Sequence, residues 1–400
     1  MNFKLPTYVQ TVLEQLNNNG FEAYVVGGCV RDMLLGHTPF DFDVCTNATP
    51  DETMLCFAEF RTVPTGIEHG TVTVMVENKA VEVTTYRIDG EYADSRHPNG
   101  VSFTASLEED LARRDFTVNA MAYHPTKGLV DLYGGREDLK AKIIRCVGDP
   151  TLRFSEDALR ILRGLRFAST LEFSLESSLV IAMETLCKTL KKVAMERVYV
   201  EFTKLLCGHG ASEILLQYAS VLSPLFSLQK QNFSLLTQVP AIAEFRYAVL
   251  LRSCEDVKGF LKSLKASNEL ITKVEPLVFL QTQTPPNTLS ETRKWVFRYG
   301  MECVEKMPIL YQAMGQQSRE FEQYIVQIKE QKLCCSFKEL AVNGKDLIAM
   351  GIPKGEGLGK VLNILLFSVM EGTLENRKEV LLTYAECLMQ NRDMFGCGVN

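Results

Sequence analysis

The sequence predicts an α+β fold, in which a head with a mixed, partly antiparallel sheet precedes a long all-helical region. Residues 1–145 alternate short apolar runs with turn-forming residues, which is typical of short strands joined by tight connections. Almost every later segment repeats its apolar residues at the spacing of an amphipathic helix. A chain of 400 residues, 46% of them hydrophobic, exceeds what one core usually organises, so we expect several packed units.

The helical region contains two breaks, which divide it into three parts. Gly208 begins the sequence Gly-His-Gly, and residues 283–287 include two consecutive prolines. The expected parts of the chain are a head at residues 1–145, a neck at 146–207, a body at 208–275 and a tail at 276–400.

Within the head, four strands are expected from apolar or alternating runs. They lie at residues 23–26, 42–45, 70–76 and 81–86, with a turn at 77–80. Between Arg87 and Phe103 the sequence loses all periodicity and collects turn formers, so we expect a long loop there. In the helical region, the clearest helices are expected at residues 156–167, 178–190 and 197–206.

Two glycines follow the first expected strand, and an arginine and two aspartates follow the glycines. Gly27 and Gly28 allow a tight turn into a helix whose free N–H groups can face a phosphate, with Arg31 in its first turn. In an extended segment, alternation places Asp41 and Asp43 on one face, where they can hold Mg²⁺ against transferring phosphates. Two close aspartates alone more often form a turn. The phosphate-binding segment beside them favours a nucleotidyl-transfer site.

A second polar cluster is the sequence Arg-Arg-Asp-Phe-Thr-Val-Asn-Ala, which begins at Arg113. Arg114 is a candidate triphosphate ligand, because a guanidinium binds phosphate oxygens in a fixed, forked geometry. Glu82, inside the expected strand 81–86, could supply a third carboxylate. A charge on an edge strand explains Glu82 equally well.

A third motif combines acidic residues and arginines, with Ser155 as the expected helix cap. On that helix Asp157 and Arg160 would lie side by side, with an acceptor next to a donor. Such a pair can bind the edge of adenine or cytosine but leaves polar groups unpaired against guanine or uracil. Arg163 continues the series. Because each three-residue step drifts by about 60°, Arg166 is expected on the side opposite Asp157.

Composition excludes several other classes of protein. A formal net charge of −6 argues against a uniformly basic nucleic-acid coat and leaves room for local basic stripes. The 12 cysteines include no C-x-x-C pair and there are 5 histidines, so we expect neither a zinc ribbon nor a disulfide framework. Reduced thiols fit a cytoplasmic location. The sequence shows no signal pattern and no membrane span, so we expect no membrane partner.

The three motifs, in this order, resemble those of the class II branch of the tRNA nucleotidyltransferase and poly(A) polymerase family. The resemblance covers essentially the whole chain, and it implies a head with the nucleotidyltransferase fold shared with DNA polymerase beta. It implies that Asp41 and Asp43 bind Mg²⁺ and are the catalytic residues. The nucleotide-binding residues that it implies are Gly28, Arg31, Arg114, Asp157, Arg160, Arg163 and Arg166. The later parts would be a nucleotide-reading neck, a helical body and a tRNA-binding tail.

Within this family, residues 64–74 resemble the corresponding stretch of the Bacillus-type CCA-adding enzymes, which favours tRNA as substrate. Residues 87–98 resemble a loop of complete CCA-adding enzymes. We expect no appended H-D phosphohydrolase domain, because His209 is the only histidine after His124 and no Asp directly follows it. The resemblance therefore implies a CTP(ATP):tRNA nucleotidyltransferase that adds C, C and A without a template. The alternatives are an A-adding enzyme with a separate CC-adding partner, and a poly(A) polymerase. The intact carboxylate pair argues against an idle tRNA-binding module, and a homodimer is left open.

Basic residues near the C-terminus resemble the RNA-contacting tail of the family. Residues 342–360 are rich in glycine and contain three lysines, Lys345, Lys354 and Lys360. This segment is either a connection between helices or a direct contact with the tRNA backbone. Lys191, Lys192 and Arg197 could also contact RNA, but we expect them to be solvated helix charges.

Overall fold

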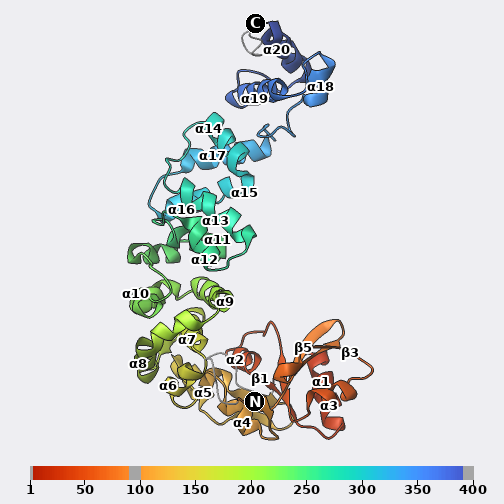
Figure 1. The fold of residues 1–400 in the computed structure, drawn as a ribbon, viewed down its shortest axis with the longest axis vertical. Helices are drawn as coiled ribbons and strands as arrows, with labels where there is room; N and C mark the ends of the chain where they lie inside the picture. The colour runs from red at the N-terminus through yellow and green to blue at the C-terminus, as the bar shows by residue number, and fades with distance from the viewer. Residues whose placement is uncertain (1–2, 90–100, 391–400) are drawn as a thin grey trace. The chain divides into compact units, whose positions relative to one another are not determined.

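The computed structural model describes residues 3–89 and 101–390 and confirms the α+β class, with a mixed sheet followed by helices (Figure 1). The chain forms two compact units. The first comprises Met1–Thr237 and Ser263–Ala266, and the second comprises Gln238–Lys262 and Ser267–Asn400. The finer division at residues 145, 207 and 275 stays a prediction. Within the described ranges, no helix has the length and apolar character needed to cross a membrane.

The head is built on a seven-stranded mixed sheet with the strand order β3-β4-β5-β2-β1-β8-β9. Its strands are β1 (Ala23–Val26), β2 (Asp43–Thr46), β3 (Arg61–Gly66), β4 (Thr71–Val76), β5 (Lys79–Thr85), β8 (Met121–His124) and β9 (Gly128–Asp131). In this sheet β2 and β5 pair in parallel, and the other neighbouring strands are antiparallel. All four predicted strands are confirmed, with ends shifted by no more than two residues.

Strands β4 and β5 form a hairpin whose turn is shorter than predicted. Val76 pairs directly with Lys79, so the turn contains two residues instead of four. These residues, Glu77 and Asn78, both have positive φ, at 50° and 59°. A left-handed conformation at both central positions matches the twist of a hairpin, and asparagine tolerates it well.

Helices cover one face of the sheet and part of the other. Val25, Val44 and Val83 are aligned across β1, β2 and β5, and α1 (Thr7–Asn18) and α3 (Pro50–Cys56) contact the sheet on this face. On the other face, Tyr24 packs in a buried cluster with Leu111 of α4 (Leu107–Ala112). On this second face, alternate residues of β4 and β5, among them Glu82, are partly or fully exposed, so the sheet is open there.

A second, two-stranded sheet corrects the loop expected between Arg87 and Phe103. β6 (Arg87–Asp89) pairs in antiparallel fashion with β7 (Val101–Phe103), so both ends of the expected loop form strands. Turn formers become dense only from Asp89 onward, which is why the extended backbone continues to that point. The rest of the expected loop lies outside the described residues.

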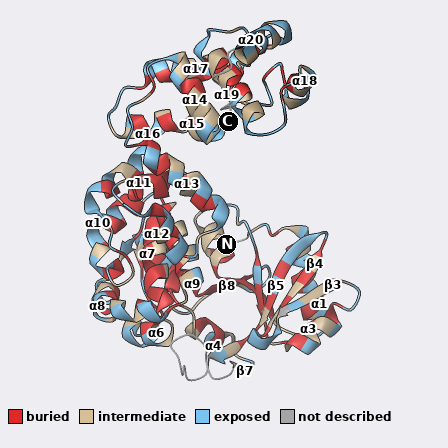
Figure 2. Cartoon of the chain, turned by 45° about the horizontal axis from the view of Figure 1, so that its top comes forward, coloured by how far each residue is buried: buried red, intermediate tan, exposed pale blue. Residues whose placement is uncertain are grey.

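After the head, the first unit continues mainly as helices. These are α5 (Gly135–Ala141), α6 (Pro150–Glu156), α7 (Leu159–Leu171), α8 (Ser177–Leu186), α9 (Met195–Leu206) and α10 (Ala211–Leu222). Short elements between them are the parallel pair β10 (Ile143–Ile144) and β11 (Ser174–Leu175) and the 3₁₀ segments η2 (Thr117–Asn119), η3 (Cys187–Lys192) and η4 (Lys230–Gln238). Helix α7 is largely buried and packs against α6, α9 and α10 (Figure 2).

The helix predicted at residues 156–167 is in fact two helices. Asp157 has extended backbone angles, φ −138° and ψ 104°, and separates α6 from α7. Ser155 therefore lies inside α6 and is not a helix cap. The cap of α6 is Asp149, whose side chain accepts from the Thr151 N–H, and Pro150 takes the first helical position. An aspartate followed by a proline is a strong start signal, and the sequence prediction overlooked it.

Gly208, one of the two predicted breaks, follows α9 and lies against α7. An added Cβ at this position would lie 2.1 Å from Ser169 Oγ and 2.7 Å from the Ser169 carbonyl carbon. Replacing Gly208 with alanine should lower the free energy of unfolding by about 1–3 kcal/mol, because the backbone of α7 would have to move. Urea denaturation measures this loss.

Gly359, within a helix of the second unit, offers a matched control for Gly208. An added Cβ there would have no described heavy atom within 4 Å, so Gly359→Ala should raise the free energy of unfolding by roughly 0.5–1 kcal/mol. Equal losses in the two variants would contradict the steric explanation for Gly208.

The second unit is helical throughout its described part. Its helices are α11 (Ala243–Leu250), α12 (Val257–Ser263), α13 (Asn268–Leu280), α14 (Leu289–Tyr299), α15 (Met301–Val304), α16 (Met307–Ala313), α17 (Arg319–Glu330), α18 (Gly344–Ala349), α19 (Glu356–Glu371) and α20 (Lys378–Gln390). Buried Arg293 of α14 donates to the Cys334 carbonyl at 2.6 Å and the Val369 carbonyl at 2.8 Å. The positively charged Arg293 side chain therefore lies at the C-terminal, carbonyl end of α19 and links α14 to that helix.

The glycine-rich segment at residues 342–360 comprises α18, the connection at residues 350–355 and the first turn of α19. Asn343 caps α18 in a reciprocal pair with Asp346, and Gly351 and Gly355 have φ of 96° and 137°. Gly351 follows the end of α18 and Gly355 precedes the start of α19, and glycine adopts such positive φ angles readily. Residues 350–355 thus form a connection between helices, and contact of the segment with tRNA stays a prediction.

Candidate active site

Asp41 and Asp43 lie on the segment that enters β2. Both side chains are exposed, whereas Phe42 between them is 5% exposed. The predicted alternation is therefore present, although the strand itself begins at Asp43. The Phe42 ring packs edge-on against Tyr8 of α1, with ring centroids 6.3 Å apart. This contact anchors the segment and leaves the two carboxylates on its open side.

Glu82 lies beside Asp43 in the sheet. The two residues are directly aligned in the parallel pairing of β2 with β5. Strand β5 lies between β4 and β2, so the alternative interpretation of Glu82 as a charge on an edge strand is wrong. The role of Glu82 as a third carboxylate stays a prediction, which its position beside Asp43 favours.

The Asp43 carboxyl is the centre of a concentration of negative charge. Desolvation by the surrounding protein, followed by the charges of Glu82 and Asp41, raises its pKa to about 6, although the charge of Arg114 opposes this shift. Crowded carboxylate oxygens are the ligand type that hard divalent cations prefer, so these residues fit a cation. Among the described residues no three His, Cys, Asp or Glu side chains form a cation site by themselves. Oxygens of substrate or water would therefore have to complete the coordination.

Arg114 lies directly beside the glycine turn of the first motif. Gly27 has φ 78°, and an added Cβ there would lie 3.1 Å from Arg114 Nη1, so both conformation and space favour glycine. Arg114 Nη2 lies 3.1 Å from Asp110, and Arg113 binds the other oxygen of Asp110 at 2.8 Å. The buried Nε of Arg114 has no hydrogen-bond partner among the described residues. Arg114 is thus fixed by Asp110 and retains a donor for a ligand.

A chain of hydrogen bonds joins the three sequence motifs. Arg31 Nη1 donates to Asn119 Oδ1 at 2.7 Å, and Asn119 Nδ2 donates to Asp115 Oδ1 at 3.3 Å. Arg163 Nε donates to Asp115 Oδ2 at 2.7 Å. Arg31 comes from the first motif, Asn119 and Asp115 from the second, and Arg163 from the third. The head and helix α7 therefore share one polar network.

Three of the predicted arginines surround the ring of Phe167. Their guanidinium carbons lie 5.3 Å (Arg31), 5.5 Å (Arg163) and 3.5 Å (Arg166) from the ring centroid, within cation–π range. Arg163 and Arg166 also share Glu201 of α9, at 3.5 and 2.8 Å. Arg166 thus faces α9 together with Arg163, and its expected position on the side away from Asp157 is wrong. That expectation assumed one continuous helix through Asp157.

Asp157 contacts α7 and α9 instead of Arg160. Its Oδ1 accepts from the Leu159 N–H at 3.0 Å, which caps the start of α7. Its Oδ2 accepts from Arg197 Nη2 at 2.7 Å. The expectation that Arg197 is merely a solvated helix charge is therefore wrong, because this guanidinium holds the Asp157 carboxylate in place.

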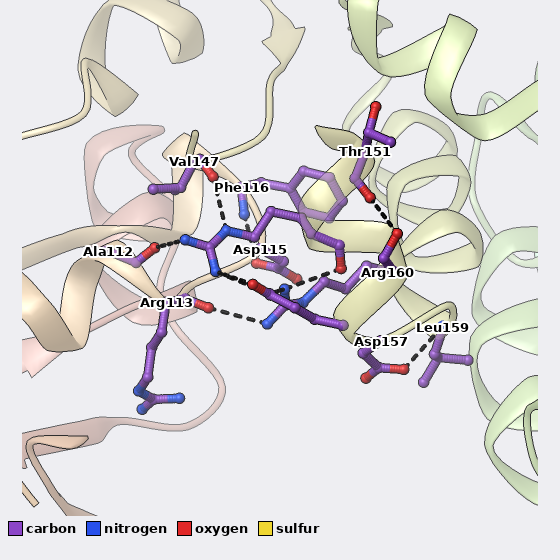
Figure 3. Close-up of polar contacts among 12 residues, drawn as sticks. Ala112, Arg113, Asp115, Phe116, Val147, Thr151, Asp157, Leu159 and Arg160 are labelled. Carbon is purple, nitrogen blue, oxygen red and sulfur yellow. Dashed lines mark hydrogen bonds and ion pairs between the residues drawn. The ribbon is translucent and has the colours of Figure 1, made fainter. Parts of the chain in front are cut away.

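Arg160 lies beside the Arg113 carbonyl of the head, and is 8% exposed (Figure 3). Its Nη2 donates to the Arg113 carbonyl at 3.1 Å and its Nη1 to the Arg153 carbonyl at 3.2 Å. Glu156 pairs with the same guanidinium. The prediction that Asp157 and Arg160 lie side by side on one helix is wrong, because α7, which carries Arg160, begins only after Asp157, which has extended backbone angles.

The sequence prediction missed Glu201 and the role of Arg197. Glu201 is 6% exposed and lies in the apolar stripe of α9, between Val198 and Phe202. A carboxylate at a core position of an amphipathic helix requires a buried partner. A charged residue at an apolar position of this helix was therefore the signal that could have indicated Glu201. The sequence alone does not identify the arginines that bind it.

Replacing Asp115 with asparagine should lower the free energy of unfolding at pH 7 by about 2 kcal/mol, because Arg163 loses its partner. Burial alone would raise the pKa of the Asp115 carboxyl, but Arg163 and Asn119 hold it below its ordinary value. The ionised carboxylate therefore stabilises the fold above about pH 4, and this contribution is lost as the pH falls through the folded-state pKa. Urea denaturation should show a constant difference from wild type between about pH 6 and 8 and a smaller one below about pH 4.

Arg163→Met in the Asp115→Asn background is the control for this prediction. It should recover part of the lost stability, because it removes a guanidinium that has lost Asp115, its closer partner, and keeps the longer 3.5 Å contact with Glu201. An equal loss at every pH would contradict the assigned ion pair.

Comparison with known proteins agrees with this arrangement. Family models match at residues 23–145 ("Poly A polymerase head domain"), at 172–231 ("Probable RNA and SrmB- binding site of polymerase A") and at 233–385 (tRNA nucleotidyltransferase domain 2). The CCA-adding enzyme of Streptococcus suis (strain 05ZYH33) is 38% identical over 395 residues, which cover 95% of this chain and 96% of that protein. The CCA-adding enzyme of Enterococcus faecalis (strain ATCC 700802 / V583) is 38% identical over 397 residues, 94% of each chain.

The crystal structure of the Bacillus stearothermophilus CCA-adding enzyme in complex with CTP superimposes with a TM-score of 0.85. It is 31% identical in sequence, and the match covers 98% of this chain and 99% of that one. Identity at this level over nearly the full length of both chains, together with one network that unites all three motifs, shows that this chain belongs to the CCA-adding enzymes.

Proposed function

We propose that this CCA-adding enzyme completes the 3′ ends of tRNA with C, C and A, using CTP and ATP and selecting each base with its own side chains. The observation that carries the proposal is the hydrogen-bonded chain from Arg31 through Asn119 and Asp115 to Arg163. It links the carboxylate end of the head to the helix that would read the base. A nucleotide bound by both parts would have its phosphates and its base fixed at the same time.

Asp41 and Asp43 would hold divalent cations, with Glu82 as a third carboxylate. We propose Mg²⁺, because these donors are all carboxylate oxygens. Bound there, the cations would neutralise phosphate charge and lower the pKa of the primer 3′-hydroxyl. Asp43, with its pKa of about 6, is ionised at neutral pH and ready to coordinate. No protein general base is needed in this scheme.

Arg114 is proposed to bind the triphosphate. Its guanidinium is close enough to Asp43 to lower the pKa of that carboxyl, and Asp110 fixes it from the other side. Arg31 and Gly28, at the turn into α2 (Gly28–Leu34), would approach the phosphates beside it. Fixed positive charges of this kind stabilise the charge that develops in phosphoryl transfer without having to reorganise.

We propose that Asp157 and Arg160 select the base. Arg163 and Arg166 would stabilise α7, the helix that carries Arg160. Arg197 holds the Asp157 carboxylate, an acceptor that suits the amino group shared by adenine and cytosine. Arg160 donates to the Arg113 and Arg153 carbonyls. These contacts orient the Arg160 guanidinium, which carries five N–H donors in all.

One assay tests the proposed function and its alternatives. The enzyme is given tRNAs that end before CCA, after the first C and after CC, with Mg²⁺ and either each nucleotide alone or CTP and ATP together, and the products are sized. With CTP and ATP together, we expect every tRNA to be completed to CCA and then left unchanged. Extension of the CC-ended tRNA alone would indicate an A-adding enzyme, and long A tails would indicate a poly(A) polymerase. Loss of activity in EDTA with recovery by Mg²⁺ would support the cofactor.

We also propose a cytoplasmic location, which is supported by the free thiols of all the described cysteines. The tRNA contacts of the tail and a homodimer stay predictions.

A further inference from the structure

Phe40, the residue immediately before Asp41, is fully exposed. Its side chain has 100% of its surface accessible, and the next most exposed of the described large apolar side chains is Leu55, at 76%. Single exposed apolar residues are common on protein surfaces and need no explanation by themselves. Phe40 differs because it adjoins the two carboxylates of the active site.

The exposure of Phe40 does not come from a loosely held segment. At one end, the His37 N–H donates to the Asp32 carbonyl at 2.8 Å, at the end of α2. At the other end, buried Phe42 packs against Tyr8, and Asp43 pairs with strands on both sides. The connection is anchored on both sides of Phe40, and its aromatic ring is nevertheless left in solvent.

The position of Phe40 limits what its ring can contact. Consecutive Cα atoms are about 3.8 Å apart, so the Cα atom of Phe40 lies about 4 Å from that of Asp41 and no more than roughly 11 Å from that of Asp43. In the proposed function the 3′-hydroxyl of the primer must reach these carboxylates. The base on that same terminal ribose is therefore brought next to Phe40, whereas the incoming base is assigned to Asp157 and Arg160.

We propose that Phe40 is a stacking platform for the 3′-terminal base of the tRNA primer, an inference that rests on the proposed function. The identity of this base changes from one addition to the next. A residue that recognises the edge of a base by hydrogen bonds would accept a primer that ends in one base and reject a primer that ends in another. An aromatic ring stacks on any base, because every base has a π face. Phe40 can thus position successive primer ends without selecting among them.

Three variants test this role. Phe40→Leu keeps an apolar side chain but removes the ring, and Phe40→Tyr keeps the ring. Leu55→Ala removes another exposed apolar side chain of the head, on α3. For Phe40→Leu we expect KM for C-ended and CC-ended tRNA to rise about tenfold, a loss within the range of one base–aromatic stack. KM for CTP and ATP should change less than about twofold in every variant, and Phe40→Tyr and Leu55→Ala should resemble wild type in KM for tRNA.

A spectroscopic signal separates stacking from structural damage. A primer that carries fluorescent pyrrolocytosine as its last base should be quenched by wild type and by Phe40→Tyr, but not by Phe40→Leu. An unchanged KM for tRNA in Phe40→Leu, equal quenching by all variants, or an equal rise in the nucleotide KM would each overturn the inference. Failure of the wild type to extend any tRNA would overturn the proposed function and this inference together. Normal extension with an unaffected Phe40→Leu would overturn only the inference.

Discussion

Asp41→Asn will reduce nucleotide incorporation by at least about a thousandfold, the scale expected when a centre of electrostatic stabilisation is lost. Asparagine has almost the same size but carries no charge, so it binds a divalent cation poorly. The Asp41 side chain is exposed, and the free energy of unfolding should therefore hardly change. Single-turnover incorporation on CC-ended tRNA with ATP measures the loss. A filter-binding assay should show nearly unchanged affinity for tRNA.

Glu59→Gln is the matched control for Asp41→Asn, because Glu59 is another exposed carboxylate of the head and has no assigned role. It should retain full activity. Normal turnover by Asp41→Asn would remove the cation assignment, and loss of tRNA affinity would move Asp41 into substrate binding.

Competition between protons and cations gives a further readout of the same site. The pKa of Asp43 is about 6, so at limiting Mg²⁺ activity should decline as the pH falls through this value. Excess Mg²⁺ should shift the decline to lower pH, since the cation favours the ionised carboxylate. A pH profile that does not respond to Mg²⁺ would contradict coordination by Asp43.

The first motif could be predicted from the sequence because its geometry is local. Gly27, Gly28 and the alternation of Asp41 with Asp43 depend on a few consecutive residues, and the strand at residues 23–26 is confirmed residue for residue. Glu82 was ambiguous for the opposite reason. Whether β5 is an edge strand depends on the order of the sheet, which no local pattern encodes.

The third motif shows more clearly which contacts the sequence alone does not predict. Asp157 and Arg160 are close in sequence, and spacing alone favoured a pair. The actual partner of Asp157 is Arg197, 40 residues away, on a different helix. Ion pairs between distant segments arise from packing, which a single sequence does not display. The helix break at Asp157 was missed because acidic residues near the start of a predicted helix also satisfy the rules for its first turn.

Asp157→Asn will relax base selection, so that incorporation of U or G relative to C and A rises by about a hundredfold, the scale of discrimination lost when a buried polar group no longer rejects a wrong partner. A carboxylate only accepts hydrogen bonds, and it therefore suits the amino groups of adenine and cytosine. An amide can also donate, and it can turn its NH₂ group toward the carbonyls of guanine and uracil. Asparagine keeps an oxygen that can accept from the Leu159 N–H, so the start of α7 should stay capped. The measurement is single-nucleotide incorporation of each of the four nucleotides on C-ended and CC-ended tRNA.

Variants of α9 distinguish recognition by Asp157 from general damage to the site. Arg197→Met removes the partner that orients Asp157 and should weaken selection about tenfold, a smaller effect because the carboxylate itself remains. Lys204→Ala, an exposed substitution on the same helix, should leave selection unchanged. Arg160→Ala is less informative, because Arg160 also joins the head to α6 through backbone carbonyls and its loss would lower stability. If Asp157→Asn kept both normal turnover and full selection, the base would have to be read by other residues, and Arg197 would then serve only to hold the neck together.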